Sequence, residues 1–77
     1  MDEKTLKDYY EIYTSFWKIF RQAVSLDDPP NEIYRQVSME ADEIYHKHLS
    51  LDGPLILDLY RATVRAIVKI KEDKDNG

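Results

Sequence analysis

Two apolar stripes run side by side near the start of the chain, and each repeats at intervals of three and four residues. Residues spaced in this way share one side of an α-helix. One stripe consists of Leu6, Tyr10, Tyr13, Trp17, Phe20 and Val24, and the other of Tyr9, Ile12, Phe16, Ile19 and Ala23. A helix with one neighbour needs a single stripe, so the pattern predicts a central helix over residues 3–24 with two neighbours.

The remaining apolar positions predict two more helices, over residues 30–49 and 54–71. The first of these has a narrow apolar face made of Ile33, Tyr34, Val37, Ala41, Ile44, Tyr45 and His48. The other is apolar over roughly 240° of its circumference and has a thin polar strip. That strip consists of Asp58, Arg61, Arg65, Lys69 and Glu72. Residues 73–77 have nothing apolar to bury, so a frayed tail is expected there.

Two short joints, at 25–29 and 50–54, share the pattern Ser-Leu-Asp-x-Pro. They supply acidic residues for helix caps and prolines for first helical turns: Asp27, Asp28, Asp52, Pro29, Pro30 and Pro54. Short joints make successive helices antiparallel neighbours. The sequence therefore predicts an all-α fold, an up-down-up antiparallel three-helix bundle that forms a single domain over residues 1–72.

Length and composition limit how this fold can be stabilised. A chain of 77 residues has a core that supplies roughly 3–5 kcal/mol of net stability. Because cysteine is absent, disulfides and thiolate metal sites cannot add to it, which leaves packing and self-association. The net charge of −4 provides no general attraction to nucleic acids or anionic lipids.

The same composition favours a cytoplasmic protein. The first residues lack a basic segment followed by an apolar run, so no signal peptide is indicated. The most apolar stretch, residues 55–70, is interrupted by four charged side chains and is not expected to span a bilayer.

Residues with catalytic or metal-binding potential are few. Glu43 and His46 have the Glu-x-x-His spacing of some helical metal sites, but a coordination shell needs further ligands on the same face. The other histidine, His48, falls within the apolar arc of its helix, which favours burial. No Gly-rich phosphate loop or nucleophile–base arrangement is present. We therefore expect a protein that is not an enzyme and has no catalytic, metal or cofactor-binding residues.

The last predicted helix has more apolar surface than two neighbours can cover. A ridge is left over once its core stripe is packed: Leu57, Tyr60, Val64 and Val68. An apolar ridge on a small acidic protein favours contact with another protein. We predict a protein–protein interaction module that forms a homo-oligomer, a dimer through this ridge. If the bundle is wider or less regular, the ridge belongs to the core instead.

The charged residues leave two other functions to consider. Arg61, Arg65 and Lys69 form a basic ladder that suits a small nucleic-acid-binding accessory protein, although three cations neutralise few phosphates. An acidic decoy would require the 15 carboxylates to gather on one face, and they are spread over all three predicted helices.

The stretch from Asp8 to Arg21 (DYYEIYTSFWKIFR), followed by Glu40 to Tyr45 (EADEIY), resembles short uncharacterised helical proteins encoded in phages and mobile elements of Gram-positive bacteria. The resemblance covers about the first two predicted helices and depends on aromatic packing residues. It implies a cytoplasmic accessory protein that acts by binding a host or element-encoded protein. It implies no activity and no functional residue.

Overall fold

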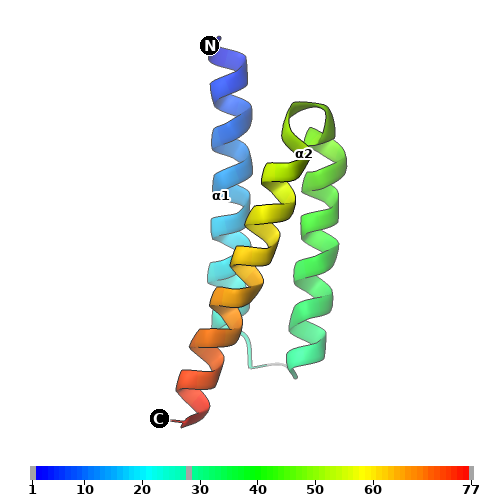
Figure 1. Ribbon diagram of the computed structural model, residues 1–77. Helices are drawn as coiled ribbons and strands as arrows, with labels where there is room; N and C mark the ends of the chain where they lie inside the picture. The colour runs from blue at the N-terminus through cyan, green and yellow to red at the C-terminus, as the bar shows by residue number, and fades with distance from the viewer. Residues whose placement is uncertain (1, 28, 77) are drawn as a thin grey trace.

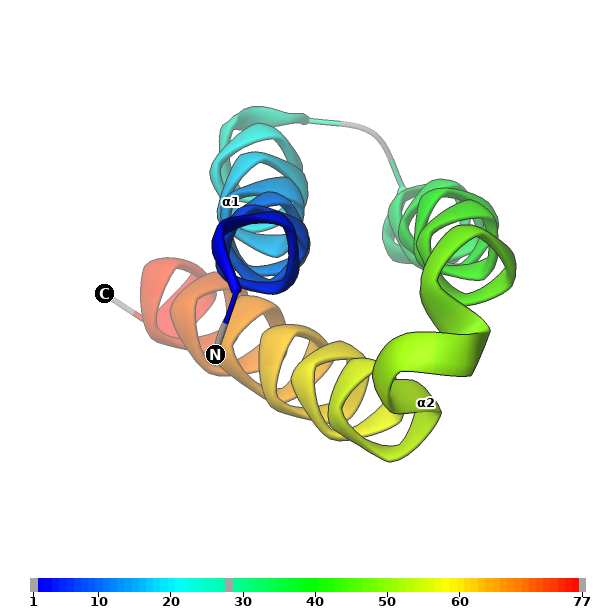
Figure 2. The same cartoon turned by 90° about the horizontal axis from the view of Figure 1, so that it is seen from above.

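The computed structural model describes residues 2–27 and 29–76, with the backbone alone for 74–76. Two helices make up the fold, α1 (Glu3–Ser25) and α2 (Pro30–Asn76), and the described residues contain no strand, as predicted. α2 bends back on itself (Figure 1). Its first arm, residues 30–47, runs antiparallel to α1, and its second arm, residues 53–76, returns alongside α1. Figure 2 shows α1 beside both arms.

The prediction of a three-helix bundle is wrong, because the second joint does not end a helix. α2 leaves helical geometry only at His48 (φ −119°, ψ 18°) and Asp52 (φ −163°, ψ 73°). Helices commonly end at a glycine in the left-handed region. No described residue has a positive φ, so Gly53 does not provide such an end. The chain therefore changes direction through a kink inside α2.

The helix ends show which cap predictions hold. Asp52 caps as predicted, since its Oδ1 accepts a hydrogen bond from the Leu55 amide at 3.1 Å. At the start of α2 the Pro29 carbonyl accepts the amides of Glu32 and Ile33, while Asp28 lies outside the described residues. Asp2, which the sequence pattern did not single out, caps α1 through the Thr5 amide at 2.7 Å.

The last helix extends further toward the C-terminus than expected. α2 continues to Asn76, through most of the segment in which fraying is predicted, and Gly77 lies outside the described residues. Figure 1 shows this end of α2 extending beyond the loop that joins α1 to α2.

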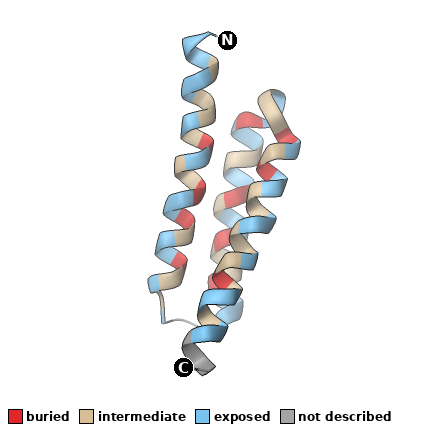
Figure 3. Cartoon of the chain, turned by 60° about the vertical axis from the view of Figure 1, so that its left-hand side comes forward, coloured by how far each residue is buried: buried red, intermediate tan, exposed pale blue. Residues whose placement is uncertain are grey.

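The core forms where α1 meets both arms (Figure 3). Its buried apolar side chains are Ile12, Phe16, Ile19, Ala23, Ile33, Val37, Ala41, Ile56 and Ile67. The four that come from α1 all belong to one of its two stripes. Both arms of α2 therefore approach the same side of α1, and most of the other stripe lies outside the core.

Candidate interaction surface

The stripe of α1 that begins at Leu6 is exposed to solvent over most of its length. The exposed fractions are 56% for Leu6, 71% for Tyr10, 53% for Tyr13 and 60% for Trp17. Only its last members, Phe20 and Val24, pack against the core. We call Leu6, Tyr10, Tyr13 and Trp17 the aromatic stripe. The prediction that two neighbours cover both stripes is wrong, and the surplus apolar surface lies on α1.

A shallow, open groove of about 320 Å³ lies between the aromatic stripe and the second arm of α2. It is lined by Tyr13, Phe16, Trp17, Phe20, Leu59, Ala62, Thr63 and Ala66. The rings of Trp17 and Phe20 lie 5.8 Å apart and are tilted by 33°. On the opposite wall, Ala62 and Ala66 have small side chains and leave room beside the rings. The groove can accept apolar side chains from another molecule.

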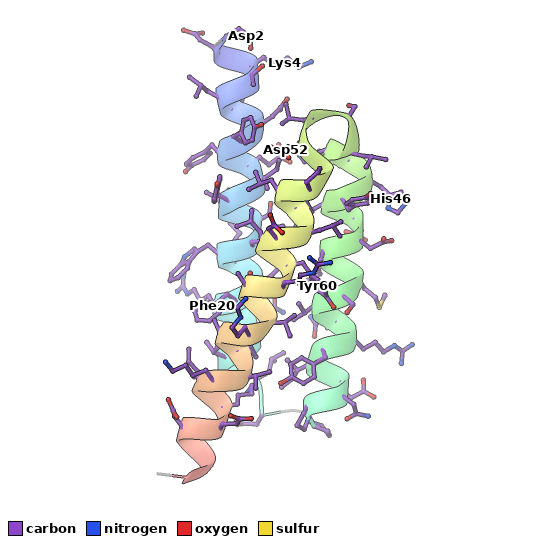
Figure 4. The ribbon with its side chains drawn as sticks, in the orientation of Figure 1. Asp2, Lys4, Phe20, His46, Asp52 and Tyr60 are labelled. Carbon is purple, nitrogen blue, oxygen red and sulfur yellow. The ribbon has the colours of Figure 1, made fainter. Side chains whose placement is uncertain are left out.

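The ridge predicted as the partner interface is half-buried over most of its length. Leu57 is exposed, whereas Tyr60, Val64 and Val68 are half-buried. Tyr60 and Val64 pack against the core, and the Tyr60 hydroxyl lies 2.7 Å from Ser38 Oγ on the first arm (Figure 4). This ridge therefore offers less apolar surface than the aromatic stripe.

The basic ladder lies on the second arm, with Arg61, Arg65 and Lys69 all exposed. None of the three forms an ion pair with a side chain in the described part of the chain. Asp58 is exposed on the same arm, so the ladder includes a negative charge.

Glu43 and His46 are exposed on the first arm, and His46 Nδ1 lies 2.9 Å from the Asp42 carbonyl oxygen. Within residues 2–27 and 29–73, no three acidic or histidine side chains converge as metal ligands would. Glu43 and His46 therefore do not belong to such a group in this part of the chain.

Two polar contacts from α1 hold the kink of α2. The Tyr9 hydroxyl donates a hydrogen bond to Asp52 Oδ2 at 3.0 Å, and Glu11 forms an ion pair with Lys47. His48 is buried, with 7% of its surface exposed, which the sequence pattern favoured but left open. Its Nε2 lies 3.7 Å from Glu11 Oε1 and has no hydrogen-bond partner among the described residues. These contacts fix the place at which α2 reverses.

The electrostatic effects of these contacts are reciprocal. The hydrogen bond from Lys47 is the main cause of a lowered pKa for Glu11, and the same bond raises the pKa of Lys47. The hydrogen bond to Asp52 is the main cause of a raised pKa for Tyr9.

The lowered pKa of Glu11 makes the stability of the fold depend on pH. A carboxylate whose pKa is lower in the folded state stabilises the fold above its unfolded pKa, here about 4.5, and this stabilisation is lost as the pH falls through the folded value. Glu11→Gln should therefore be less stable than the unmodified chain at neutral pH, and the two stability curves should converge at acidic pH. Urea unfolding followed by circular dichroism across this range measures both curves. Glu43→Gln removes an exposed carboxylate from the first arm and serves as the control. If the stability of Glu11→Gln differs from that of the unmodified chain by the same amount at every pH, the expectation is contradicted.

Comparisons with protein families, curated proteins and solved structures find no match for this chain. The resemblance to phage and mobile-element proteins stays a prediction. Within the described residues, neither helix contains a stretch that is both long and apolar enough to cross a membrane.

Proposed function

We propose that this chain is a non-enzymatic protein–protein interaction module that forms a homodimer through the aromatic stripe of α1. The supporting observation is the continuous exposure of Leu6, Tyr10, Tyr13 and Trp17 along one side of a helix. Tyrosine and tryptophan combine a large apolar ring with a polar group, and they are enriched at interfaces between proteins.

The size of the stripe is consistent with such an interface. Its three rings and Leu6 expose surface on the order of 500 Å², toward the upper end of the range for the largest apolar patch on a monomer. A standard interface buries about 800 Å² on each partner. The stripe supplies more than half of this area, and the walls of the adjacent groove can supply the rest.

A second copy of the chain is the partner that the stripe fits best. A two-fold dimer buries the same patch on both subunits, so a single apolar stripe can cover itself. Association also adds stability to a fold in which nine apolar side chains are buried among the described residues.

Light scattering coupled to size-exclusion chromatography tests the proposal over a range of concentrations. We expect a dimer at high micromolar concentration. Tyr10→Lys should weaken dimerisation at least tenfold, or about 1.4 kcal/mol, because it places a charge in the most exposed part of the stripe. Met39→Lys is the matched control, since Met39 is also an exposed apolar side chain but lies on the first arm. A strict monomer, or equal effects of the two substitutions, would contradict the proposal.

Nucleic-acid binding through Arg61, Arg65 and Lys69 has less support. The three side chains are exposed, but the chain carries a net charge of −4 and Asp58 lies on the same arm. Retention on DNA that decreases with salt and is lost in Arg65→Glu would favour this alternative.

A further inference from the structure

We infer that the two copies pair with their α1 helices antiparallel, about a two-fold axis between residues 11 and 12, so that the first turns of each α1 lie in the groove of the other copy. This arrangement rests on the proposed homodimer and specifies its geometry.

The spacing of the aromatic stripe is the same in both directions. Its members at 6, 10, 13 and 17 are separated by four, three and four residues. The midpoint of 6 and 17 coincides with that of 10 and 13, between residues 11 and 12. An axis there places Leu6 opposite Trp17 of the second copy and Tyr10 opposite Tyr13. Each contact occurs twice, as a two-fold interface requires.

The charges that flank the stripe favour the antiparallel orientation. Glu3 and Arg21 are 18 positions apart (21 − 3), or about five helical turns, so they lie on the same edge of α1. Both side chains are exposed. In an antiparallel pair, Glu3 of one copy comes close to Arg21 of the other at both ends. In a parallel pair, the two-fold axis places this edge of the two helices on opposite sides of the interface, so Glu3 and Arg21 gain no partner of opposite charge.

The shape of the molecule leads to the same arrangement. α1 begins beyond the kink of α2 (Figure 1), and Figure 4 shows Asp2 and Lys4 on the far side of Asp52. Leu6 lies on this overhang and is not among the residues that pack on the core. The groove lies along the other half of α1, beside Trp17. Antiparallel pairing brings the overhang of each copy to the groove of the other.

The groove and the overhang are complementary in side-chain size. Ala62 and Ala66 leave space next to Trp17, and Leu6 is a large side chain that is mostly exposed and does not pack on the core of its own copy. Placing a large side chain against small ones allows close packing across the interface. The axis position also displaces the second arms of the two copies toward opposite ends of the α1 pair, since each arm lies along the later part of its own α1.

Cross-linking of single-cysteine variants tests the orientation directly, because the chain has no cysteine of its own. Glu3→Cys and Arg21→Cys are prepared separately and treated with a short bismaleimide, alone and as an equimolar mixture. We expect the mixture to form several times more covalent dimer than either variant alone. Met39→Cys measures cross-linking by random collision. Stronger cross-linking of each variant with itself than in the mixture would overturn the antiparallel arrangement.

Charge reversal provides a second readout. Glu3→Arg and Arg21→Glu each place like charges opposite one another twice, and each should weaken the dimer about three- to tenfold at low salt. The double variant restores opposite charges and should return to within about twofold of the unmodified dimer. Failure of the double variant to recover would overturn the pairing of Glu3 with Arg21.

The two proposals fail in different ways. A monomeric unmodified chain contradicts the homodimer itself. The chain can instead form a dimer that Tyr10→Lys weakens, while the Glu3→Cys and Arg21→Cys variants each cross-link only with themselves. That result supports the proposed homodimer and contradicts the antiparallel arrangement.

Discussion

Ile12→Ala is expected to unfold a large fraction of the protein at 25 °C. Ile12 is completely buried at the contact between α1 and the arms of α2. Truncating a buried isoleucine to alanine costs about 2–5 kcal/mol, through lost apolar burial and the cavity that remains. A domain of this size has a total stability of roughly 3–5 kcal/mol, so little would be left. Helical circular dichroism as a function of temperature and urea measures the loss.

Ile70→Ala is the matched control, because the same side chain is shortened at a position that is 40% exposed. Its cost should stay below about 1 kcal/mol, as is usual for a surface position. Both variants are measured at the same protein concentration, since a dimer adds stability that depends on concentration. Equal destabilisation by the two substitutions would contradict the position of the core.

Asp52→Ala is expected to destabilise the fold by about 2 kcal/mol. One carboxylate oxygen caps the Leu55 amide at 3.1 Å, and the other accepts the Tyr9 hydroxyl at 3.0 Å. Loss of a cap costs about 1 kcal/mol, and loss of a hydrogen bond costs a similar amount. Both contacts are at the kink, so the second arm also loses its polar contact with Tyr9 of α1 there. Urea unfolding gives the free-energy difference.

Two further variants separate these contributions. Asp52→Asn keeps an oxygen for the Leu55 amide and should recover at least half of the lost stability. Asp58→Ala removes an exposed aspartate from the same arm and should change stability by less than about 0.5 kcal/mol. If Asp52→Ala is no more destabilising than Asp58→Ala, the contacts at Asp52 do not hold the kink.

The span of α1 and part of the core were predictable because the information for them is local. The three- and four-residue spacing places Ile12, Phe16 and Ile19 on one side of α1, and all three are buried. The apolar arc favoured the burial of His48 without deciding it, and an aspartate two residues before Pro54 correctly indicated the cap at Asp52.

The path of the chain at the second joint was not predictable in the same way. The pattern Ser-Leu-Asp-Gly-Pro is compatible with a loop and with a kink, because neither proline nor aspartate requires the helix to end there. Contacts from Tyr9 and Glu11, about 40 residues away in sequence, hold Asp52 and Lys47 in place. Such contacts form only after the chain has folded back, so a local pattern does not reveal them.

The sequence established that the chain is helical, that α1 has two apolar stripes, and that the chain has more apolar surface than its own helices can cover. It could not show where the surplus lies, because both stripes of α1 are apolar and have the same spacing. Packing of the complete chain settles this, since both arms of α2 meet the stripe of Ile12, Phe16 and Ile19 and leave Tyr10 and Trp17 exposed. The uncovered apolar surface expected at Leu57 and Tyr60 is therefore found mainly on α1. The position of the two arms decides which residues of α1 face the solvent, and that position depends on contacts between residues far apart in the sequence.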